Sequence, residues 1–361
     1  MKRRAFLQSL FRCAGLSSVL GIVAKTSLEA LAPGLPPRPR GKTLLDIHVH
    51  LFGKGDGGTG CFLSEEQQRH FNYRFFLELL AIDPAKGDMD GQYLRRLLRD
   101  ARASTLDRFL LLAQDGRYDH RGKFDKANTH FYVPNDYLFE ICRRHPDLFS
   151  PCVSINPKRR DALSEIDRCA EKGAKACKVH PPTQDVDLRD PAFRPFYRRL
   201  RERGLVLMVH TGTEHASKVP DQGLGDPARL EPALQEGCTV IAAHSGLGSF
   251  FDTEDFFQNL RRLVRRYPRL YCGTGNLGGM LRWRNLPRLL QAPEILPRLL
   301  HGSDYPFPPN PLVQWSRLSP PLLTSLLEEE NLLDRAWAIE KALGMPDPVF
   351  GDRAARILGL A

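Results

Sequence analysis

From residue 43 onward, short apolar runs alternate with longer amphipathic stretches. The runs are rich in residues typical of buried strands, and the stretches repeat apolar positions with the helical period. We expect strands at 43–50, 108–114, 149–156, 174–180, 205–210, 239–244, 270–274 and 298–304. We expect helices at 92–103, 135–144, 161–172, 195–203, 228–235, 255–267 and 332–343.

This order of elements predicts an α/β fold built from repeated βα units around a parallel sheet. Eight strands with helices between them indicate a closed (β/α)₈ TIM barrel, and no linker divides residues 43–361 into further domains. The strands are almost continuously apolar, as expected where helices cover one face and the barrel core the other. Long loops are expected after several strands, on the catalytic face of the barrel, at 52–71, 115–133, 211–227 and 305–320.

The composition supports a globular protein with a small-molecule partner. Of 361 residues, 42% are hydrophobic and 26% charged, which is enough apolar material for one large core. The formal charge of +10 comes largely from arginines scattered through the expected helices. No basic run is interleaved with aromatic residues, so we expect no nucleic-acid partner, while an acidic small molecule stays open.

The eight cysteines occur singly and without a CxxC pair. Cys152, Cys177, Cys238 and Cys272 lie inside apolar runs, which favours buried thiols over a disulfide framework.

Residues 1–42 differ in character from the rest of the chain. Arg3 and Arg4 precede an apolar stretch at 13–24 that ends at Lys25, and a Pro-rich spacer follows at 32–40. This pattern resembles a twin-arginine export signal, which predicts an exported protein, periplasmic or associated with the cell envelope, and contact with the twin-arginine machinery. The alternative is an amphipathic cytosolic N-terminus.

The strongest chemical signal is the set of polar residues at the expected C-terminal ends of strands. Asp46, His48 and His50 share one strand, and strict alternation would point all three to the same side. Burial of two imidazoles and a carboxyl in one strand requires compensation, which a metal ion supplies. His210 and Asp304 end two further strands, and with His48 and His50 they form a four-ligand set for zinc or another divalent transition metal.

Three more residues extend this set. His244 ends a strand, and Lys178 and His180 share another, where a lysine is costly to bury as a cation. Lys178 has three possible roles: it is carboxylated and bridges two ions with His210 and His244 on the second, it pairs with an acidic substrate, or it forms a salt bridge to Asp46 or Asp304. We expect His180 to contact the substrate.

His145 and His301 do not close strands at this edge, and we interpret both as structural histidines.

Five motifs of the chain resemble those of a known family. Asp-Ile-His-Val-His at 46–50, Lys-Val-His-Pro at 178–181, His-Thr-Gly at 210–212, His-Ser-Gly at 244–246 and Gly-Ser-Asp-Tyr-Pro at 302–306 are similar, in this order, to motifs of the amidohydrolase superfamily. The similarity is to the amidohydrolase-related group that includes aminocarboxymuconate-semialdehyde decarboxylase-like enzymes. The segment 350–358 is similar to the helix that closes these barrels.

The resemblance implies a role for each residue. His48, His50 and His210 would be metal ligands, Asp304 both a ligand and the catalytic proton acceptor, and His244 either a catalytic group that polarises the substrate or a ligand of a second ion. It implies one zinc or similar ion, with two as the alternative.

The function expected from these features is metal-dependent hydrolysis of a C–N or C–O bond in an amide, a lactone or another ester. The first alternative is non-oxidative decarboxylation or hydration of an unsaturated or aromatic carboxylic acid, which arginines near the pocket would favour. Arg74, Arg117 and Arg121 lie in or beside the expected loops. The alternative from another class is an exported metal-binding protein without turnover, and a homo-oligomer stays open.

Overall fold

The computed structural model describes residues 34–360. The expected export signal therefore lies outside the described residues, whereas the end of the Pro-rich spacer is an irregular segment leading to the first strand. None of the helices in the described part combines the length and apolar character needed to cross a bilayer.

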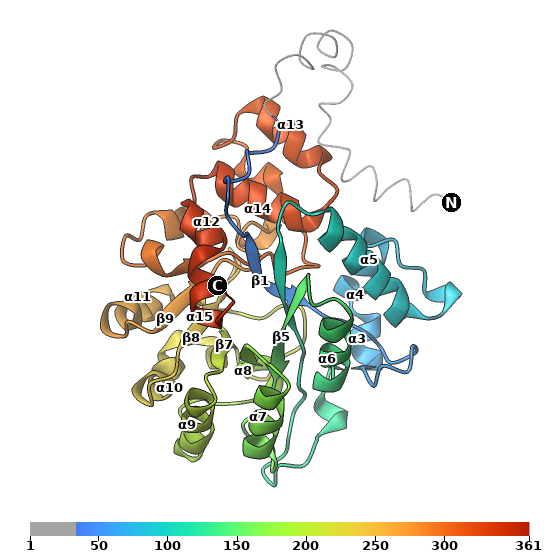
Figure 1. Cartoon of the computed structure of the whole chain (residues 1–361), viewed down its shortest axis with the longest axis vertical. Coiled ribbons are helices and arrows are strands. Elements are labelled where there is room, and N and C mark those ends of the chain that lie inside the picture. Colours follow the sequence, from blue (N-terminus) through green and yellow to red (C-terminus); the bar gives the residue numbers. More distant parts are fainter. Residues whose placement is uncertain (1–33, 361) are drawn as a thin grey trace.

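Eight parallel strands form the centre of the molecule in the order of their sequence, which confirms the predicted barrel (Figure 1). They are β1 (Leu45–His50), β3 (Arg108–Leu112), β5 (Phe149–Ser154), β6 (Ala176–Val179), β7 (Val206–His210), β8 (Val240–Ala243), β9 (Leu270–Gly273) and β10 (Leu299–Leu300). Each lies within a predicted strand, and several end earlier than predicted.

Backbone hydrogen bonds connect the first and last strands. The Ile47 amide donates to the His301 carbonyl at 3.0 Å, and the His50 amide donates to the Tyr305 carbonyl at 3.0 Å. These bonds carry the sheet across the seam, so the chain segment after β10 runs beside the C-terminal end of β1.

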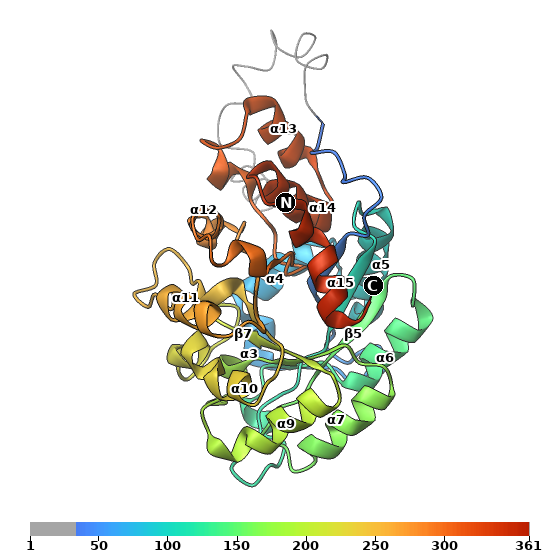
Figure 2. The same ribbon diagram turned by 60° about the vertical axis from the view of Figure 1, so that its left-hand side comes forward.

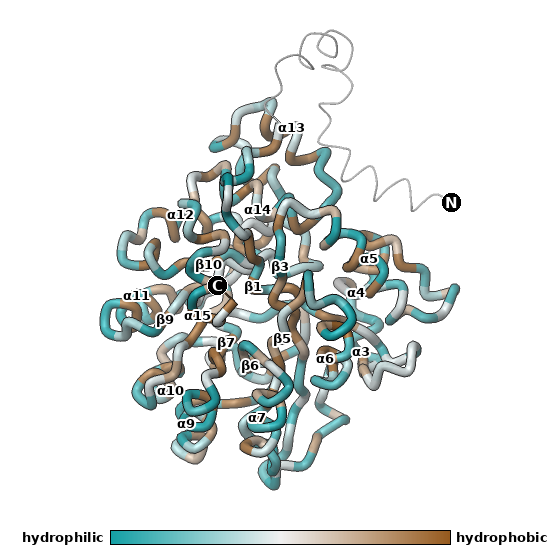
Figure 3. The backbone as a smooth tube through the Cα atoms, viewed as in Figure 1, coloured by the Kyte–Doolittle hydropathy of each residue, from teal (hydrophilic) through white to brown (hydrophobic). Residues whose placement is uncertain are grey.

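The predicted helices surround the barrel, as the rotated view in Figure 2 shows. They are α5 (Met89–Ala103), α6 (Asn135–Arg144), α7 (Ala162–Glu171), α9 (Arg194–Glu202), α10 (Glu231–Gln235), α11 (Phe257–Arg266) and α14 (Leu332–Ala342). Each has an apolar stripe that faces the strands, and the seams between helices and strands form the outer core. Figure 3 shows hydrophobic residues concentrated in the central strands and hydrophilic ones on the outer helices.

Several further elements were not predicted, and most of them are shorter than seven residues. They are the hairpin β2 (Phe62–Leu63) and β4 (Phe131–Tyr132), and the helices α3 (Glu65–Arg69), α4 (Phe71–Leu79), α8 (Pro181–Gln184), α12 (Asn285–Leu290) and α13 (Pro320–Glu328). Part of the expected loop at 52–71 therefore contains regular elements, and β2 pairs with β4 from the next long loop.

The interior of the barrel is a second apolar cluster, separate from the outer core. It contains side chains such as Leu45, Ile47 and Met208, together with Ala354 and Leu358 of α15 (Asp352–Leu358). The C-terminal helix thus closes the end of the barrel opposite the strand termini that carry the polar residues, as the resemblance implied.

The cysteines agree with the prediction of buried thiols. All seven in the described part of the chain are buried and unpaired, including the four at strand-like positions.

A buried ion pair connects the segment after β10 to α14. His301 is fully buried, and its Nδ1 lies 2.8 Å from Glu340 Oε2. Burial alone would lower the pKa of His301, but the charge and hydrogen bond of Glu340 outweigh it and raise the pKa above its ordinary value. His301 is structural, as expected.

We expect Glu340→Gln to make folding less sensitive to pH. A raised folded-state pKa stabilises the protein fully below the unfolded value of about 6.5, and this stabilisation is lost as pH rises through the folded value. Urea unfolding should show the variant about 1–3 kcal/mol less stable than the wild type at pH 6. The difference should shrink at pH 9.

The variant Glu328→Gln, at an exposed glutamate, is the control, with an expected change within about 0.5 kcal/mol at either pH. A difference for Glu340→Gln that stays constant or grows with pH would contradict the assignment.

Candidate metal centre

Three of the four predicted ligands meet around one point at the C-terminal rim of the barrel. Asp304 Oδ1 lies 3.1 Å from His48 Nε2 and 3.1 Å from His50 Nε2. The three donor atoms lie within 4.8 Å of one another. His48 and Asp304 are buried, while the His50 side chain is 16% exposed. We call this set the first group.

A register shift in β1 turns His48 and His50 to the same face of the strand as Leu45 and Ile47. The pairing with β3 is interrupted between Asp46 and Val49. Leu45 and Ile47 face the barrel interior, and after the shift the next residue, His48, also turns toward the rim.

The expectation that Asp46 shares a side with His48 and His50 by simple alternation is therefore wrong. Asp46 Oδ1 instead accepts hydrogen bonds from the amides of His48, at 2.8 Å, and of Ser303, at 3.0 Å. Asp46 thus connects β1 to the segment that carries Asp304.

A second group of donors lies on the neighbouring strands. His180 follows β6, His210 ends β7, and Glu214 lies in the loop after β7. Glu214 Oε2 is 3.1 Å from His180 Nε2 and 3.8 Å from His210 Nε2. The two imidazole rings are stacked, with centroids 3.9 Å apart. The structure thus places His210 with this second group and not within the first, and its role as a ligand of the first ion stays a prediction.

His244 lies between the two groups. Its ring centroid is 5.1 Å from that of His48 and 4.6 Å from that of His210, so all five imidazoles share one basin. Nδ1 donates to the Gly275 carbonyl at 2.8 Å, because a carbonyl can only accept. Burial lowers the pKa of His244 well below its ordinary value. The neutral ring therefore presents a lone pair at Nε2.

Lys178 lies at the base of this basin and is fully buried. Its Nζ is 3.4 Å from His48 Nε2, and burial lowers the pKa of Lys178 to about 8. Within residues 34–360 it forms no ion pair with Asp46 or Asp304, so the salt bridge, one of its three possible roles, is absent from the described residues. Carboxylation and pairing with an acidic substrate stay predictions.

Two charged residues of the basin, Glu214 and Arg282, were not predicted from the sequence. Glu214 lies four residues after His210, a spacing that could have drawn attention to it. Arg282 ends the short helix η7 (Met280–Arg282) after β9, and nothing in the sequence separates it from the many surface arginines. Of the arginines named from the sequence, Arg74 and Arg121 are exposed, and Arg117 donates to the Thr183 carbonyl at 2.8 Å.

Arg282 carries a buried positive charge beside the histidines. One terminal nitrogen donates to the Thr213 carbonyl at 2.8 Å, while the other is buried without a hydrogen-bond partner. Burial lowers the pKa of the guanidinium, and the nearby charges of Asp304 and Glu214 partly offset this effect. Arg282 forms no ion pair with any carboxylate in the described part of the chain.

The donor chemistry fits a divalent transition metal. Burial lowers the pKa of His48 and of His210 well below the ordinary value, so both rings are neutral and have lone pairs to offer. His210 Nε2 has no hydrogen-bond partner, although buried polar atoms are normally paired. Neutral imidazoles with carboxylate oxygens are the ligand types that zinc and similar ions prefer.

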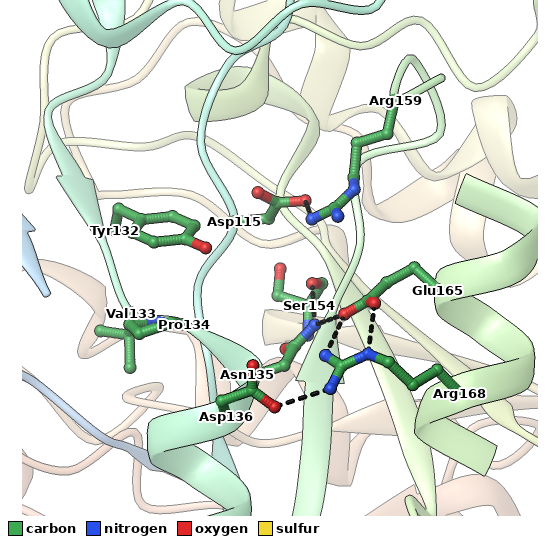
Figure 4. A pocket seen from close by; sticks show the side chains of 10 residues that line it. All are labelled: Asp115, Tyr132, Val133, Pro134, Asn135, Asp136, Ser154, Arg159, Glu165 and Arg168. Atoms are coloured by element: carbon green, nitrogen blue, oxygen red, sulfur yellow. Dashed lines mark hydrogen bonds and ion pairs between the residues drawn. The ribbon is translucent and has the colours of Figure 1, made fainter. Parts of the chain in front are cut away.

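A separate polar pocket of about 360 Å³ lies beside the barrel and contains none of these histidines (Figure 4). Its charged groups pair with one another: Arg168 binds Glu165 at 2.7 Å and Asp136 at 2.6 Å, and Arg159 lies 3.4 Å from Asp115. We interpret it as a structural network that holds α6 and α7 against the strands.

The fold and the imidazole and carboxylate donors at the C-terminal rim place this chain among the (β/α)₈ barrel proteins with a candidate metal centre. Within this class, the chain belongs to the amidohydrolase family: the family model described as Amidohydrolase matches residues 45–318. The resemblance found in the sequence is thus confirmed. None of the curated proteins compared with the chain matches it.

Solved structures agree with the fold. A putative 2-pyrone-4,6-dicarboxylic acid hydrolase from Pseudomonas putida has a TM-score of 0.55 and 18% identity, over 88% of this chain and 98% of that one. An uncharacterized TIM-barrel protein from Bordetella bronchiseptica has a TM-score of 0.54 and 16% identity, over 82% and 99%. A 5-carboxyvanillate decarboxylase from Sphingomonas paucimobilis has a TM-score of 0.52 and 14% identity, over 89% and 100%.

We expect Gly275→Ala to weaken metal binding. An added Cβ would lie 2.9 Å from His48 Nδ1 and 3.2 Å from His244 Nδ1, so both rings would have to shift. Competition with a fluorescent chelator should show metal affinity about 10–100-fold lower, as when the support of a ligand is disturbed.

The matched control is Gly278→Ala in the same loop, where the nearest atom would be 3.5 Å from the new Cβ. Wild-type affinity in both variants would argue against a metal site at His48.

Proposed function

We propose that this protein is a metal-dependent hydrolase that cleaves a C–N or C–O bond of a small carbonyl compound, such as an amide, a lactone or another ester. The observation that supports this proposal is the position of Asp304, whose Oδ1 is 3.1 Å from both histidines of β1. A carboxylate at this point can contact an ion and accept a proton at the same place.

An ion bound by His48, His50 and Asp304 would polarise the substrate carbonyl and lower the pKa of a bound water to about 7. Asp304 accepts a proton from the attacking water and passes it to the departing nitrogen or oxygen, so that the bond breaks without a net charge being left behind. The surrounding buried side chains restrict the access of bulk water to this transfer.

His244 had two expected roles, as a polarising group or as a ligand. Its Nδ1–H bond to the Gly275 carbonyl leaves Nε2 as an acceptor. A lone pair at this position suits a ligand or a proton acceptor better than a donor to developing negative charge.

Arg282 favours a second candidate, non-oxidative decarboxylation of a carboxylic acid. A buried guanidinium without a carboxylate partner is a suitable place for an anionic group of the substrate. Structural neighbours include a 5-carboxyvanillate decarboxylase and a 2,6-dihydroxybenzoate decarboxylase, as well as a hydrolase of a dicarboxylic acid. The names of these three neighbours all refer to acidic substrates, and together with Arg282 they support our proposal that the substrate of this chain carries an acidic group.

We further propose export through the twin-arginine pathway, on the basis of Arg3 and Arg4 before the apolar stretch. Export of a folded protein would allow the ion to be loaded before translocation.

We expect hydrolysis of a panel of lactones, esters and amides to stop on treatment with a chelator and to return with zinc. Asp304→Asn should lower kcat by about 10²- to 10⁴-fold, because the proton acceptor is lost. Asp255→Asn, which removes a surface partner of Arg288, is the control and should leave kcat unchanged.

Activity that is indifferent to chelator and to Asp304→Asn would overturn the metal-dependent scheme. Release of labelled carbon dioxide from aromatic or unsaturated acids, with no hydrolysis, would select the decarboxylase. Zinc binding without either reaction would indicate a binding protein.

Arg282→Gln should raise the KM for carboxylate-bearing substrates by about tenfold or more, since a charge-assisted contact is worth roughly 1.5–3 kcal/mol. The KM for uncharged analogues should change little. Arg284→Gln is the control, because Arg284 is exposed and lies over the Trp283 ring. Equal effects of Arg282→Gln on charged and uncharged substrates would indicate a structural role instead.

A further inference from the structure

Large apolar side chains are exposed along one part of the C-terminal rim. Nine such side chains are exposed in residues 34–360, and six of them lie in the loops after β8, β9 and β10. These six are Phe250, Phe251, Met280, Leu281, Leu312 and Trp315, and we call them the apolar rim. Single exposed apolar residues are ordinary, whereas a cluster of them indicates a surface that binds a partner.

Hydrogen bonds join the three loops into one surface. The Phe250 amide donates to the Leu281 carbonyl at 2.8 Å, which attaches the loop after β8 to the loop after β9. The Gln314 side chain donates to the Trp283 carbonyl at 2.8 Å, which attaches the loop after β10 to the same loop. The six side chains therefore lie on neighbouring segments, although up to 65 residues of chain separate them.

Packing within the protein does not account for these residue types. Trp315 is 70% exposed, Met280 55% and Phe250 53%. Folding thus leaves most of their apolar area in contact with water, where it contributes little to stability. A partner that removes this area from water would supply the missing contribution.

Two exposed arginines lie beside the apolar rim. The guanidinium carbon of Arg284 is 4.9 Å from the centroid of the Trp283 ring. Arg317 is the single charged residue of segment 305–327, in a chain of which 26% is charged. In the part of the chain that the structure describes, neither arginine forms an ion pair with a carboxylate.

The exposed carboxylates of these loops are Glu254 and Asp255, both in the loop after β8. Arg288 binds Asp255 at 2.8 Å and neutralises it. The loops after β9 and β10 contribute no exposed carboxylate within residues 34–360. The surface therefore combines apolar and aromatic side chains with an excess of positive charge.

This combination disfavours a second copy of the chain as the partner. A two-fold symmetric dimer uses the same patch on both copies, so Arg284 and Arg317 would face a surface that is itself positive. Placing like charges opposite one another is unfavourable.

A bilayer with anionic headgroups matches both properties of the surface. Tryptophan is enriched where proteins meet the membrane–water interface, and arginine is attracted to anionic lipid phosphates. The formal charge of +10 adds a long-range attraction of the whole chain toward such a bilayer.

We propose that the apolar rim, together with Arg284 and Arg317, binds the surface of an anionic lipid bilayer. Binding is peripheral: the apolar side chains enter the headgroup region, and the two arginines contact phosphate groups. Because the same loops border the basin of histidines, the bound protein turns this basin toward the membrane. The proposal depends neither on the reaction nor on the export of the chain.

Vesicle co-sedimentation of the full chain tests the proposal. One set of vesicles contains phosphatidylcholine alone, and the other contains an equal mixture of phosphatidylcholine and phosphatidylglycerol. We expect the wild type to bind the mixed vesicles about tenfold or more tightly than phosphatidylcholine, because the arginines gain from anionic lipid.

Apolar variants test the insertion of side chains. Trp315→Ser and Met280→Ser should each weaken binding to mixed vesicles about fivefold to tenfold, since each removes apolar area that the bilayer would cover. Leu163→Ser is the matched control, because Leu163 is an exposed apolar residue of α7, away from the rim, and it should bind as the wild type does. Circular dichroism melting checks that every variant is folded.

Charge variants test the contact with phosphate. Arg284→Gln and Arg317→Gln should each weaken binding to mixed vesicles about fivefold and leave binding to phosphatidylcholine unchanged. Arg102→Gln, at an exposed arginine of α5, is the matched control and should behave as the wild type.

Absence of binding to both kinds of vesicle would overturn the proposal, and so would equal binding to both. Binding that all four rim variants retain would place the contact elsewhere on the chain, with the same consequence. Light scattering covers the other occupant: a dimer that Trp315→Ser or Met280→Ser converts to a monomer, without vesicle binding, would show that a second copy covers the apolar rim and would overturn the lipid assignment.

Discussion

The contact between the end of β1 and the segment after β10 is the constraint on which the candidate centre depends. These segments are about 250 residues apart in the chain, yet Asp304 Oδ1 lies 3.1 Å from each histidine of β1. Asp46 holds them together through the Ser303 amide, and Gly302 permits the approach, because a Cβ there would lie 2.8 Å from His48 Cβ. The same contacts that close the barrel between β1 and β10 therefore bring the donor atoms of the site together.

Burial sets the protonation of this centre. Desolvation disfavours the charged form of each imidazole, so rings that would titrate near neutrality in water stay neutral and keep their lone pairs. Arg282 and Glu214 also lie in this basin, and in the described part of the chain neither forms an ion pair with a side chain of permanent opposite charge. The rim therefore contains buried polar and charged groups without partners, and a metal ion and an anionic substrate could pair with them. These groups are the physical basis of the function proposed for the chain.

The fold was accessible from the sequence because its signals are local. Each of the eight strands lies in an apolar run of the sequence, and six of the seven predicted helices have nine residues or more, enough to show the helical period. The short elements α3, α8 and the hairpin β2–β4 were missed, because two to five residues carry no measurable period. The bulge in β1 was missed for a related reason, since a sequence pattern predicts only regular alternation of side chains along a strand. On that basis Asp46 was predicted to lie on the same side as the histidines.

The barrel, its family and the residues at the rim could all be predicted from the chain's local patterns, because strand ends in a parallel barrel all meet at one edge. How those residues are grouped in space became visible only in the folded chain. The tertiary structure placed His210 with His180 and Glu214, set the tautomer of His244 through the Gly275 carbonyl, and showed which arginine is buried in the basin. These outcomes depend on distances of a few ångströms between side chains from different strands and loops. The type of a residue indicates which chemistry it can perform, but it does not indicate which residues surround it in space.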